Sequence, residues 1–287
     1  MNKFNNPYFP AADPFVLLHE GKYYLYFTNE EGPQDGYYVY TSSDLINWKN
    51  EGYCLRKEDV KGEKWFWAPE VVYYNNKFYM AYSSEEHIGI ATSSSPLGPF
   101  VQNNKRWITE DLAIDGHFFK DDDGSVYLYY AKLDGQNKIY VAKMSSDLLD
   151  IDKSTETLLI TAEDEWETKD CLVTEGPFVL KYENEYYLAY SANHTRSEDY
   201  AIGYAKSKSP LGPFVKYKNN PILYKNKKFN GIGHHSFTTS KDGKQLIISC
   251  HSHYNKSTFK PRMFCLSLAY FKKNDEDENI LVINELE

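Results

Sequence analysis

The chain has 287 residues, with 32 Lys or Arg and 41 Asp or Glu, so its formal net charge at pH 7 is −9. Aromatic residues make up 16% of it and charged residues 25%. This composition excludes a disordered chain, which would be poor in aromatic residues. The acidic balance, without a basic cluster, argues against nucleic-acid binding. No apolar run approaches the roughly 18 residues that a membrane span needs.

The cysteines and the N-terminus indicate the compartment. Four cysteines are widely separated, which predicts ordinary thiols rather than a disulfide framework or a zinc site: Cys54, Cys171, Cys250 and Cys265. The first seven residues contain no apolar signal core, so the sequence as given predicts a cytoplasmic protein. A secreted or periplasmic protein whose signal peptide had been removed would show the same start.

An apolar run, a turn and an aromatic strand recur along the chain. In the first copy, 15–18 leads through Glu20-Gly21 to 23–27. Such a pattern predicts a β-hairpin. The copies begin at Phe15, Val71, Phe118, Phe178 and Phe237, in steps of 56, 47, 60 and 59 residues.

Some copies continue beyond the hairpin. Residues 88–92 and 201–205 predict third strands, and the phrase Ser-Pro-Leu-Gly-Pro-Phe at 95–100 and 209–214 predicts a turn before a short outer strand. A period of this size with three or four strands is typical of a β-propeller. We therefore predict an all-β, five-bladed β-propeller forming one domain over residues 1–287. A large β-sandwich is the alternative, which the repeated phrase disfavours.

Ionisable residues precede the start of every copy. The first strand of each propeller blade lies along the central axis, so the residues just before it should converge on one mouth of the channel. They are Asp13, Glu70, Asp115, Glu175 and His234. Each carboxylate alone would more often cap backbone N–H groups. As a set they predict an active site, because crowded carboxylates hold one group protonated and another ionised, as glycoside hydrolysis requires.

The motifs around these residues resemble those of glycoside hydrolase family 43, in the same order and over nearly the whole chain. They are Ala12-Asp13-Pro14, Trp67-Ala68-Pro69-Glu70, Ile114-Asp115-Gly116, Thr174-Glu175-Gly176-Pro177 and Gly231-Ile232-Gly233-His234. The resemblance implies a five-bladed propeller and an inverting mechanism. It also implies that Asp13 is the general base, Glu175 the general acid and Asp115 the residue that orients the acid and tunes its pKa.

Physical requirements agree with these roles. An inverting enzyme needs its two carboxyls about 6.5–9.5 Å apart, with room for water. Asp13 precedes the first blade and Glu175 the fourth, so they can face each other across the mouth. Repulsion from Asp115 would raise the pKa of Glu175 and keep it protonated.

The histidines leave alternatives open. The resemblance suggests a histidine near the axis at His234, which in some members binds calcium together with waters. One imidazole makes a weak site, since Ca²⁺ prefers about six to eight oxygens, and a buried histidine at the channel wall is the alternative. His235 could face the axis instead, whereas His251 and His253 are predicted to be structural. No nucleotide, flavin or haem motif occurs, so we expect no required cofactor.

Two further side chains are candidates for sugar binding. The family often has an arginine from the fifth blade touching sugar hydroxyls, and Arg262 matches loosely; a guanidinium suits a diol, while a surface salt bridge is the alternative. Trp67 would stack on a sugar ring, against the alternative of packing between blades. The loops 107–113 and 162–171 are candidates for narrowing the mouth.

The predicted function is an exo-acting hydrolase that releases arabinose or xylose from plant polysaccharide, as an α-L-arabinofuranosidase or β-xylosidase. An endo-arabinanase with an open groove is the alternative enzyme. A non-catalytic carbohydrate-binding propeller is the alternative outside enzymes, although a binding module needs no set of three ionisable carboxyls. A phosphorolytic mannoside enzyme ranks low, because no Arg or Lys cluster stands at the blade starts.

Overall fold

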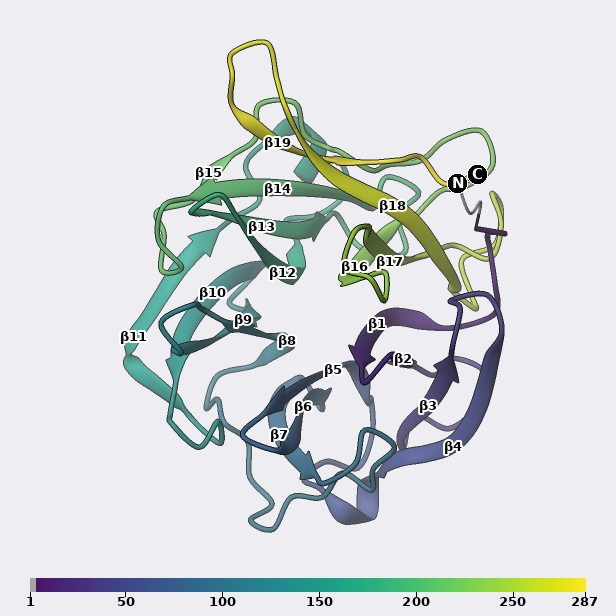
Figure 1. Ribbon diagram of the computed structural model, residues 1–287, viewed down its shortest axis with the longest axis vertical. Helices are drawn as coiled ribbons and strands as arrows, with labels where there is room; N and C mark the ends of the chain where they lie inside the picture. Colours follow the sequence, from purple (N-terminus) through teal and green to yellow (C-terminus); the bar gives the residue numbers. More distant parts are fainter. Residues whose placement is uncertain (1–3) are drawn as a thin grey trace.

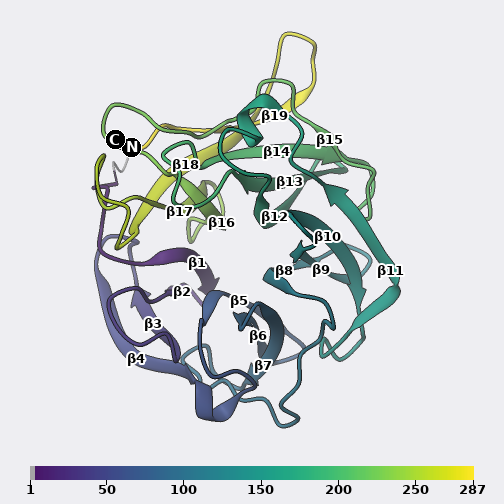
Figure 2. The same ribbon diagram turned by 180° about the vertical axis from the view of Figure 1, so that it is seen from behind.

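The computed structural model describes residues 4–287 and confirms the five-bladed β-propeller. Figures 1 and 2 show five twisted sheets around a central axis, with strands β1, β5, β8, β12 and β16 innermost. Within each sheet, neighbouring strands follow chain order and pair antiparallel, as the repeated hairpins predict. The described helices are two 3₁₀ segments of three residues each, and none is long and apolar enough to cross a membrane.

The first three blades occupy the N-terminal half of the chain. Blade 1 contains β1 (Ala12–His19), β2 (Lys22–Thr28), β3 (Gly36–Ser42) and β4 (Trp48–Arg56), followed by a 3₁₀ segment, η1 (Lys57–Asp59). Blade 2 contains β5 (Trp67–Tyr74), β6 (Lys77–Ser84) and β7 (His87–Ser93). Blade 3 contains β8 (Ala113–Lys120), β9 (Val126–Leu133), β10 (Asn137–Met144) and β11 (Ile151–Ile160).

The last two blades complete the ring. Blade 4 follows the second 3₁₀ segment, η2 (Glu165–Glu167), and contains β12 (Thr174–Tyr182), β13 (Glu185–Ala192), β14 (Ala201–Ser207) and β15 (Val215–Lys216). Blade 5 contains β16 (Gly233–Thr239), β17 (Leu246–Ser252), β18 (Met263–Lys273) and β19 (Asn279–Ile283). The repeated phrase forms the predicted turn in blades 2 and 4. It is followed by β15 in blade 4 and by a single bridge from Val101 to Thr92 in blade 2.

Tight turns explain why the inner strands form hairpins. Glu20-Gly21, Asn75-Asn76 and Glu183-Asn184 have positive φ at both central residues. That geometry matches the right-handed twist of the strands on either side and is favoured in two-residue hairpin loops. The apolar and aromatic runs flanking these turns supply the buried faces.

The blades are held together by apolar side chains between them. Among residues 4–287, five hydrophobic clusters each join two adjacent blades. The ring closes where the N-terminal segment lies against blade 5: the Tyr8 N–H donates to the Phe264 carbonyl, and the Ala11 N–H donates to the Arg262 carbonyl. The start of the described chain and its C-terminus lie on the same side of the ring (Figure 1).

A β-bulge interrupts the first strand of every blade near its start. The bulge residues with positive φ are Asp13 (49°), Ala68 (44°), Asp115 (62°), Gly176 (57°) and His234 (43°). Non-glycine residues rarely adopt this conformation, and such residues concentrate at functional sites. The five bulges thus form a ring of turned backbone around the axis, and this ring positions the candidate site.

Candidate active site

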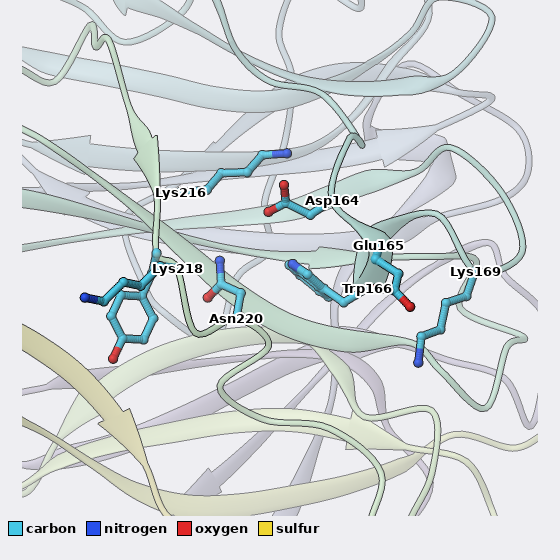
Figure 3. A pocket seen from close by; sticks show the side chains of 8 residues that line it. Asp164, Glu165, Trp166, Lys169, Lys216, Lys218 and Asn220 are labelled. Carbon is cyan, nitrogen blue, oxygen red and sulfur yellow. The ribbon is translucent and has the colours of Figure 1, made fainter.

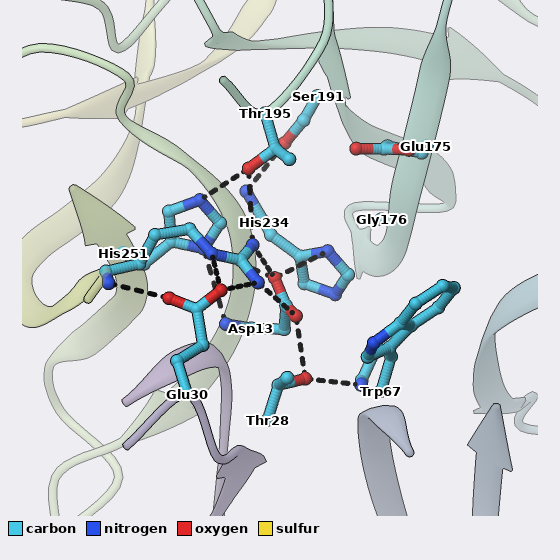
Figure 4. Close-up of polar contacts among 12 residues, drawn as sticks. Asp13, Thr28, Glu30, Trp67, Glu175, Gly176, Ser191, Thr195, His234 and His251 are labelled. Atoms are coloured by element: carbon cyan, nitrogen blue, oxygen red, sulfur yellow. Dashed lines mark hydrogen bonds and ion pairs between the residues drawn. The ribbon is translucent and has the colours of Figure 1, made fainter. Parts of the chain in front are cut away.

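A pocket of about 510 Å³ is lined by three of the bulge residues and by Glu175, which precedes the bulge of blade 4. The structure therefore brings together four of the predicted residues: Asp13, Asp115, Glu175 and His234. Predicted residues Trp67 and Arg262 also line this pocket, whereas Glu70 and His235 do not. Figure 4 shows Asp13 and Glu175 on either side of His234.

Asp13 is surrounded by hydrogen-bond donors. Its Oδ1 accepts from Arg262 Nη1 at 2.6 Å, and its Oδ2 accepts from Thr28 Oγ1 at 2.7 Å. Burial opposes ionisation of this carboxyl, but the charge of Arg262 outweighs it and holds the pKa of Asp13 well below its ordinary value. Asp13 is therefore a carboxylate at neutral pH, as a general base must be.

Glu175 has the opposite electrostatic character. Burial raises its pKa to about 7 and the charge of Asp13 adds to this, while hydrogen bonds from Tyr200 Oη (2.9 Å) and Asn137 Nδ2 (3.0 Å) lower it. Burial is thus the main cause, where the sequence analysis expected repulsion from Asp115. Glu175 keeps a substantial protonated fraction near neutral pH, as a general acid must.

Asp115 lies beside the backbone of Glu175. Its Oδ2 accepts the N–H of Gly176, the residue that follows Glu175, at 3.0 Å. Burial raises the pKa of Asp115 well above its ordinary value, and the charges of Glu175 and Asp13 raise it further. Both raised pKa values favour protonation of this pair of carboxyls, compared with isolated carboxyls.

Arg262 connects Asp13 to a second buried carboxylate. Its backbone N–H donates to Glu30 Oε2 at 2.8 Å and its Nε donates to Glu30 Oε1 at 3.1 Å, while Lys260 Nζ lies 3.0 Å from Glu30 Oε1. Arg262 is only 8% exposed, so the alternative of a surface salt bridge is wrong. The guanidinium is positioned to lower the pKa of Asp13 as well as to line the pocket.

Two tryptophans form part of the wall. Trp67 stacks on Trp65 with ring centroids 5.9 Å apart and an interplanar angle of 13°, and its Nε1 donates to Gln34 Oε1. Trp67 is half-buried, and Trp65 is exposed. These flat faces suit the apolar side of a sugar ring.

The adjacent histidines point to different places. His234 Nδ1 lies 3.4 Å from Asp13 Oδ1 and 3.9 Å from Asp115 Oδ2. His235 is buried in a smaller cavity of about 20 Å³ along the axis, and neither of its ring nitrogens has a hydrogen-bond partner in the structure. The role of His235 in sugar binding stays a prediction, because its ring does not line the pocket.

These residues do not fit a calcium ion held by protein ligands. Among residues 4–287 there is no group of three or more His, Cys, Asp or Glu that could hold a metal. The carboxylates nearest His234 are already engaged, Asp13 by Arg262 and Asp115 by Gly176. Calcium bound to His234 through waters stays a prediction.

Sequence reasoning missed several site residues. His251, expected to be only structural, is fully buried with its Nδ1 3.3 Å from Asp13 Oδ1, and its Nε2 lies 3.3 Å from Thr195 Oγ1. The two-residue spacing of His251 and His253 gave no sign of this, because it depends on the neighbouring blade. Other missed residues come from loops or later strands: Thr28, Glu30, Asn137, Thr195 and Tyr200.

Glu70 does not lie at the mouth, contrary to expectation. In blade 2 the bulge occupies Ala68 and Pro69, so Glu70 pairs with Ala81 inside the ladder. Its carboxylate accepts from His117 Nδ1 at 2.7 Å and from the Phe118 N–H at 3.0 Å. Glu70 therefore joins blade 2 to blade 3 within the channel.

The rim is also built from segments other than those expected. It includes Gln34, Glu86, Leu133, residues 194–196 and residues 259–260. The loops 107–113 and 162–171 do not line the pocket.

A second hollow, of about 550 Å³, lies on the outer part of blade 4 (Figure 3). Its lining includes Trp166 and Lys216, and Lys216 pairs with the buried carboxylate of Glu167 at 2.6 Å. The carboxyls that line it, Asp164 and Glu165, are neighbours in the chain and do not belong to the set at the blade starts. The chemistry of acid and base therefore belongs to the axial pocket.

Comparison with known proteins agrees with this geometry. The model of the family "Glycosyl hydrolases family 43" matches residues 4–275. The chain is a glycosyl hydrolase of family 43. A solved structure from Bacteroides thetaiotaomicron, described as an endo-1,4-beta-xylanase, is 40% identical with a TM-score of 0.90, covering 96% of this chain and 95% of that one.

Other members of family 43 are more distant in sequence. A β-D-galactofuranosidase of Aspergillus niger is 26% identical over 98% of this chain and 85% of its own length. A xylosidase/arabinosidase of Bacteroides ovatus is 27% identical over 71% of this chain and 76% of its own. This family 43 chain is therefore an enzyme that hydrolyses glycosidic bonds, with the inverting mechanism general to the family, and its substrate is a carbohydrate.

Proposed function

We propose that this enzyme removes single arabinofuranosyl or xylosyl units from plant-type oligosaccharides or polysaccharides. The observation that carries the proposal is the axial pocket, in which Asp13 has a lowered pKa and Glu175 a raised one. Its volume of about 510 Å³ lies within the usual range for small-ligand sites. Family members named xylosidase/arabinosidase and β-xylosidase support the choice of sugar.

The proposed mechanism assigns one proton transfer to each carboxyl. Asp13 accepts a proton from a water that attacks the anomeric carbon, while Glu175 donates a proton to the departing glycosidic oxygen. One water is consumed, and the configuration at the anomeric carbon inverts. Arg262 and Thr28 hold Asp13 in place, and Tyr200 and Asn137 hold Glu175.

The pKa values predict the pH dependence of kcat/KM. Glu175 must be protonated, so activity falls as pH rises through about 7. Asp13 must be ionised, so the acidic limb lies below the ordinary pKa of an aspartate. A profile measured from pH 3 to 9 checks both limbs, and activity still rising at pH 9 would contradict the assignment of Glu175.

The substrate is tested with nitrophenyl α-L-arabinofuranoside, β-D-xyloside and β-D-galactofuranoside, together with linear arabinan and xylan. We expect hydrolysis of the arabinofuranoside or the xyloside, and release of monosaccharide alone from the polymers. Galactofuranoside is included because the Aspergillus niger relative is named for it. Hydrolysis of galactofuranoside alone would overturn the proposed sugar.

An endo-acting hydrolase is the second candidate. It is favoured by the endo-1,4-beta-xylanase description of the 40% identical structure and by relatives named arabinan endo-1,5-alpha-L-arabinosidase. Oligosaccharides appearing before monosaccharide in a polymer digest would establish this candidate instead.

A further inference from the structure

The five bulges are connected to one another in a regular way. At four of the five seams between blades, the N–H of the positive-φ residue donates to a side chain on the second strand of the preceding blade. These pairs are Ala68 to Thr28 Oγ1 (2.8 Å), Asp115 to Ser83 Oγ (3.0 Å), His234 to Ser191 Oγ (2.8 Å) and Asp13 to His251 Nδ1 (3.3 Å). Buried N–H groups require such partners.

The four accepting side chains occupy equivalent positions. Each stands opposite the residue before the bulge of its own blade: Thr28 opposite Ala12, Ser83 opposite Trp67, Ser191 opposite Glu175 and His251 opposite Gly233. In blade 3 this position, opposite Ile114, is held by Ala131, which is fully buried. A methyl group cannot accept a hydrogen bond.

The exception falls at the seam between Asp115 and Glu175. Without an acceptor on residue 131, the Gly176 N–H donates to Asp115 Oδ2 at 3.0 Å instead. Within residues 4–287, the Gly176 N–H is the one group that donates a hydrogen bond to the Asp115 carboxylate. The same bond attaches Asp115 to the residue that follows Glu175.

We propose that Ala131 is a positioning residue for catalysis: by offering no acceptor, it leaves the Gly176 N–H to Asp115 and so fixes the Asp115 carboxylate beside Glu175. The inference rests on the proposed roles of Asp115 and Glu175. A serine at this position would present the same hydroxyl that Ser83 and Ser191 present at their seams. The Gly176 N–H would then turn to the hydroxyl, and Asp115 would lose its anchor.

The test is Ala131→Ser, assayed on phenyl and 2,4-dinitrophenyl glycosides of whichever sugar the enzyme accepts. If Asp115 no longer tunes the pKa of the general acid Glu175, the rate should fall most on substrates with poor leaving groups, which depend most on protonation. Because acid–base assistance contributes about 10²–10⁴-fold, we expect kcat on the phenyl glycoside to fall about tenfold or more. On the dinitrophenyl glycoside, which needs little protonation, we expect it to stay within about twofold.

Two control variants separate this effect from general damage. Ala142→Ser adds a hydroxyl to another fully buried alanine of blade 3, away from the pocket. Ala131→Gly alters the same site but adds no acceptor. In both variants, the ratio of kcat on the phenyl glycoside to kcat on the dinitrophenyl glycoside should equal that of the wild type. A changed ratio in Ala131→Gly would overturn the proposal, and this outcome can be read even if Ala131→Ser does not fold.

A double variant tests whether residue 131 acts through Asp115. In an Asp115→Asn background, adding Ala131→Ser should cause little further loss on the dinitrophenyl or the phenyl glycoside. Equal losses on both substrates in Ala131→Ser would overturn the inference. Full activity of Asp115→Asn and Glu175→Gln would instead refute the proposed function, so the two failures are distinguishable.

Discussion

Replacing Glu175 with glutamine should lower kcat on aryl glycosides with poor leaving groups by about 10²–10⁴-fold, the usual contribution of general acid–base catalysis. The single amide oxygen of glutamine can still accept from Asn137, and its NH2 group can donate to the Tyr200 hydroxyl, so the pocket should keep its shape. It has no proton to give to the departing oxygen. Steady-state kinetics with phenyl and dinitrophenyl glycosides should show a much smaller loss on the activated substrate.

The stability of Glu175→Gln provides its control. Wild-type Glu175 has a pKa of about 7 in the folded protein, above the ordinary value near 4.5. The folded state therefore binds more protons than the unfolded state between these values, and wild-type stability falls as pH rises through this window. Glutamine does not ionise, so the variant should melt at or above the wild-type temperature at pH 8. Inactivity accompanied by a lower melting temperature at every pH would indicate structural damage instead.

Replacing Asp13 with asparagine should lower turnover by about 10²–10⁴-fold on all leaving groups alike, because the attacking water loses its base. This uniform loss contrasts with the leaving-group dependence expected for Glu175→Gln. The comparison assigns base and acid from kinetics alone. A loss confined to poor leaving groups would reverse the two roles.

Asp13→Asn also removes the charge that faces Arg262. Glu30 remains as a partner of the guanidinium, so Arg262 keeps one buried carboxylate and the fold should survive. Calorimetry with an unhydrolysed disaccharide measures the binding of sugar to Asp13→Asn separately from its turnover. Retained binding with lost turnover would place Asp13 in the chemistry, and lost binding would place it in sugar recognition.

Local sequence pattern determined the fold because each blade is a local structure. Alternating apolar strands and two-residue turns such as Glu20-Gly21 and Asn75-Asn76 form hairpins whatever surrounds them. When five such copies follow one another at similar spacing, a ring is the arrangement in which every blade buries both of its faces. Residues at the start of each copy then meet at the axis, so the sequence alone predicts that Asp13, Asp115 and Glu175 lie together.

Other parts of the site depend on contacts between blades, which sequence spacing does not encode. Glu70 precedes the expected start of its copy as Asp115 does, yet it stands two residues after the positive-φ residue Ala68, inside the ladder, and its carboxylate turns into the channel. Glu30 reaches the pocket from a loop, and Tyr200 reaches Glu175 from the segment before β14; no repeat marks either residue.

The sequence by itself thus determined the five blades and the three carboxyls, because hairpin formation and repeat position are local properties. The tertiary structure alone decided which carboxyl is ionised and which protonated. Those states depend on burial and on the placement of Arg262 against Asp13, 249 residues away along the chain. It also revealed Ala131 as the exception among the seams, since an absent acceptor has meaning only beside the four that are present.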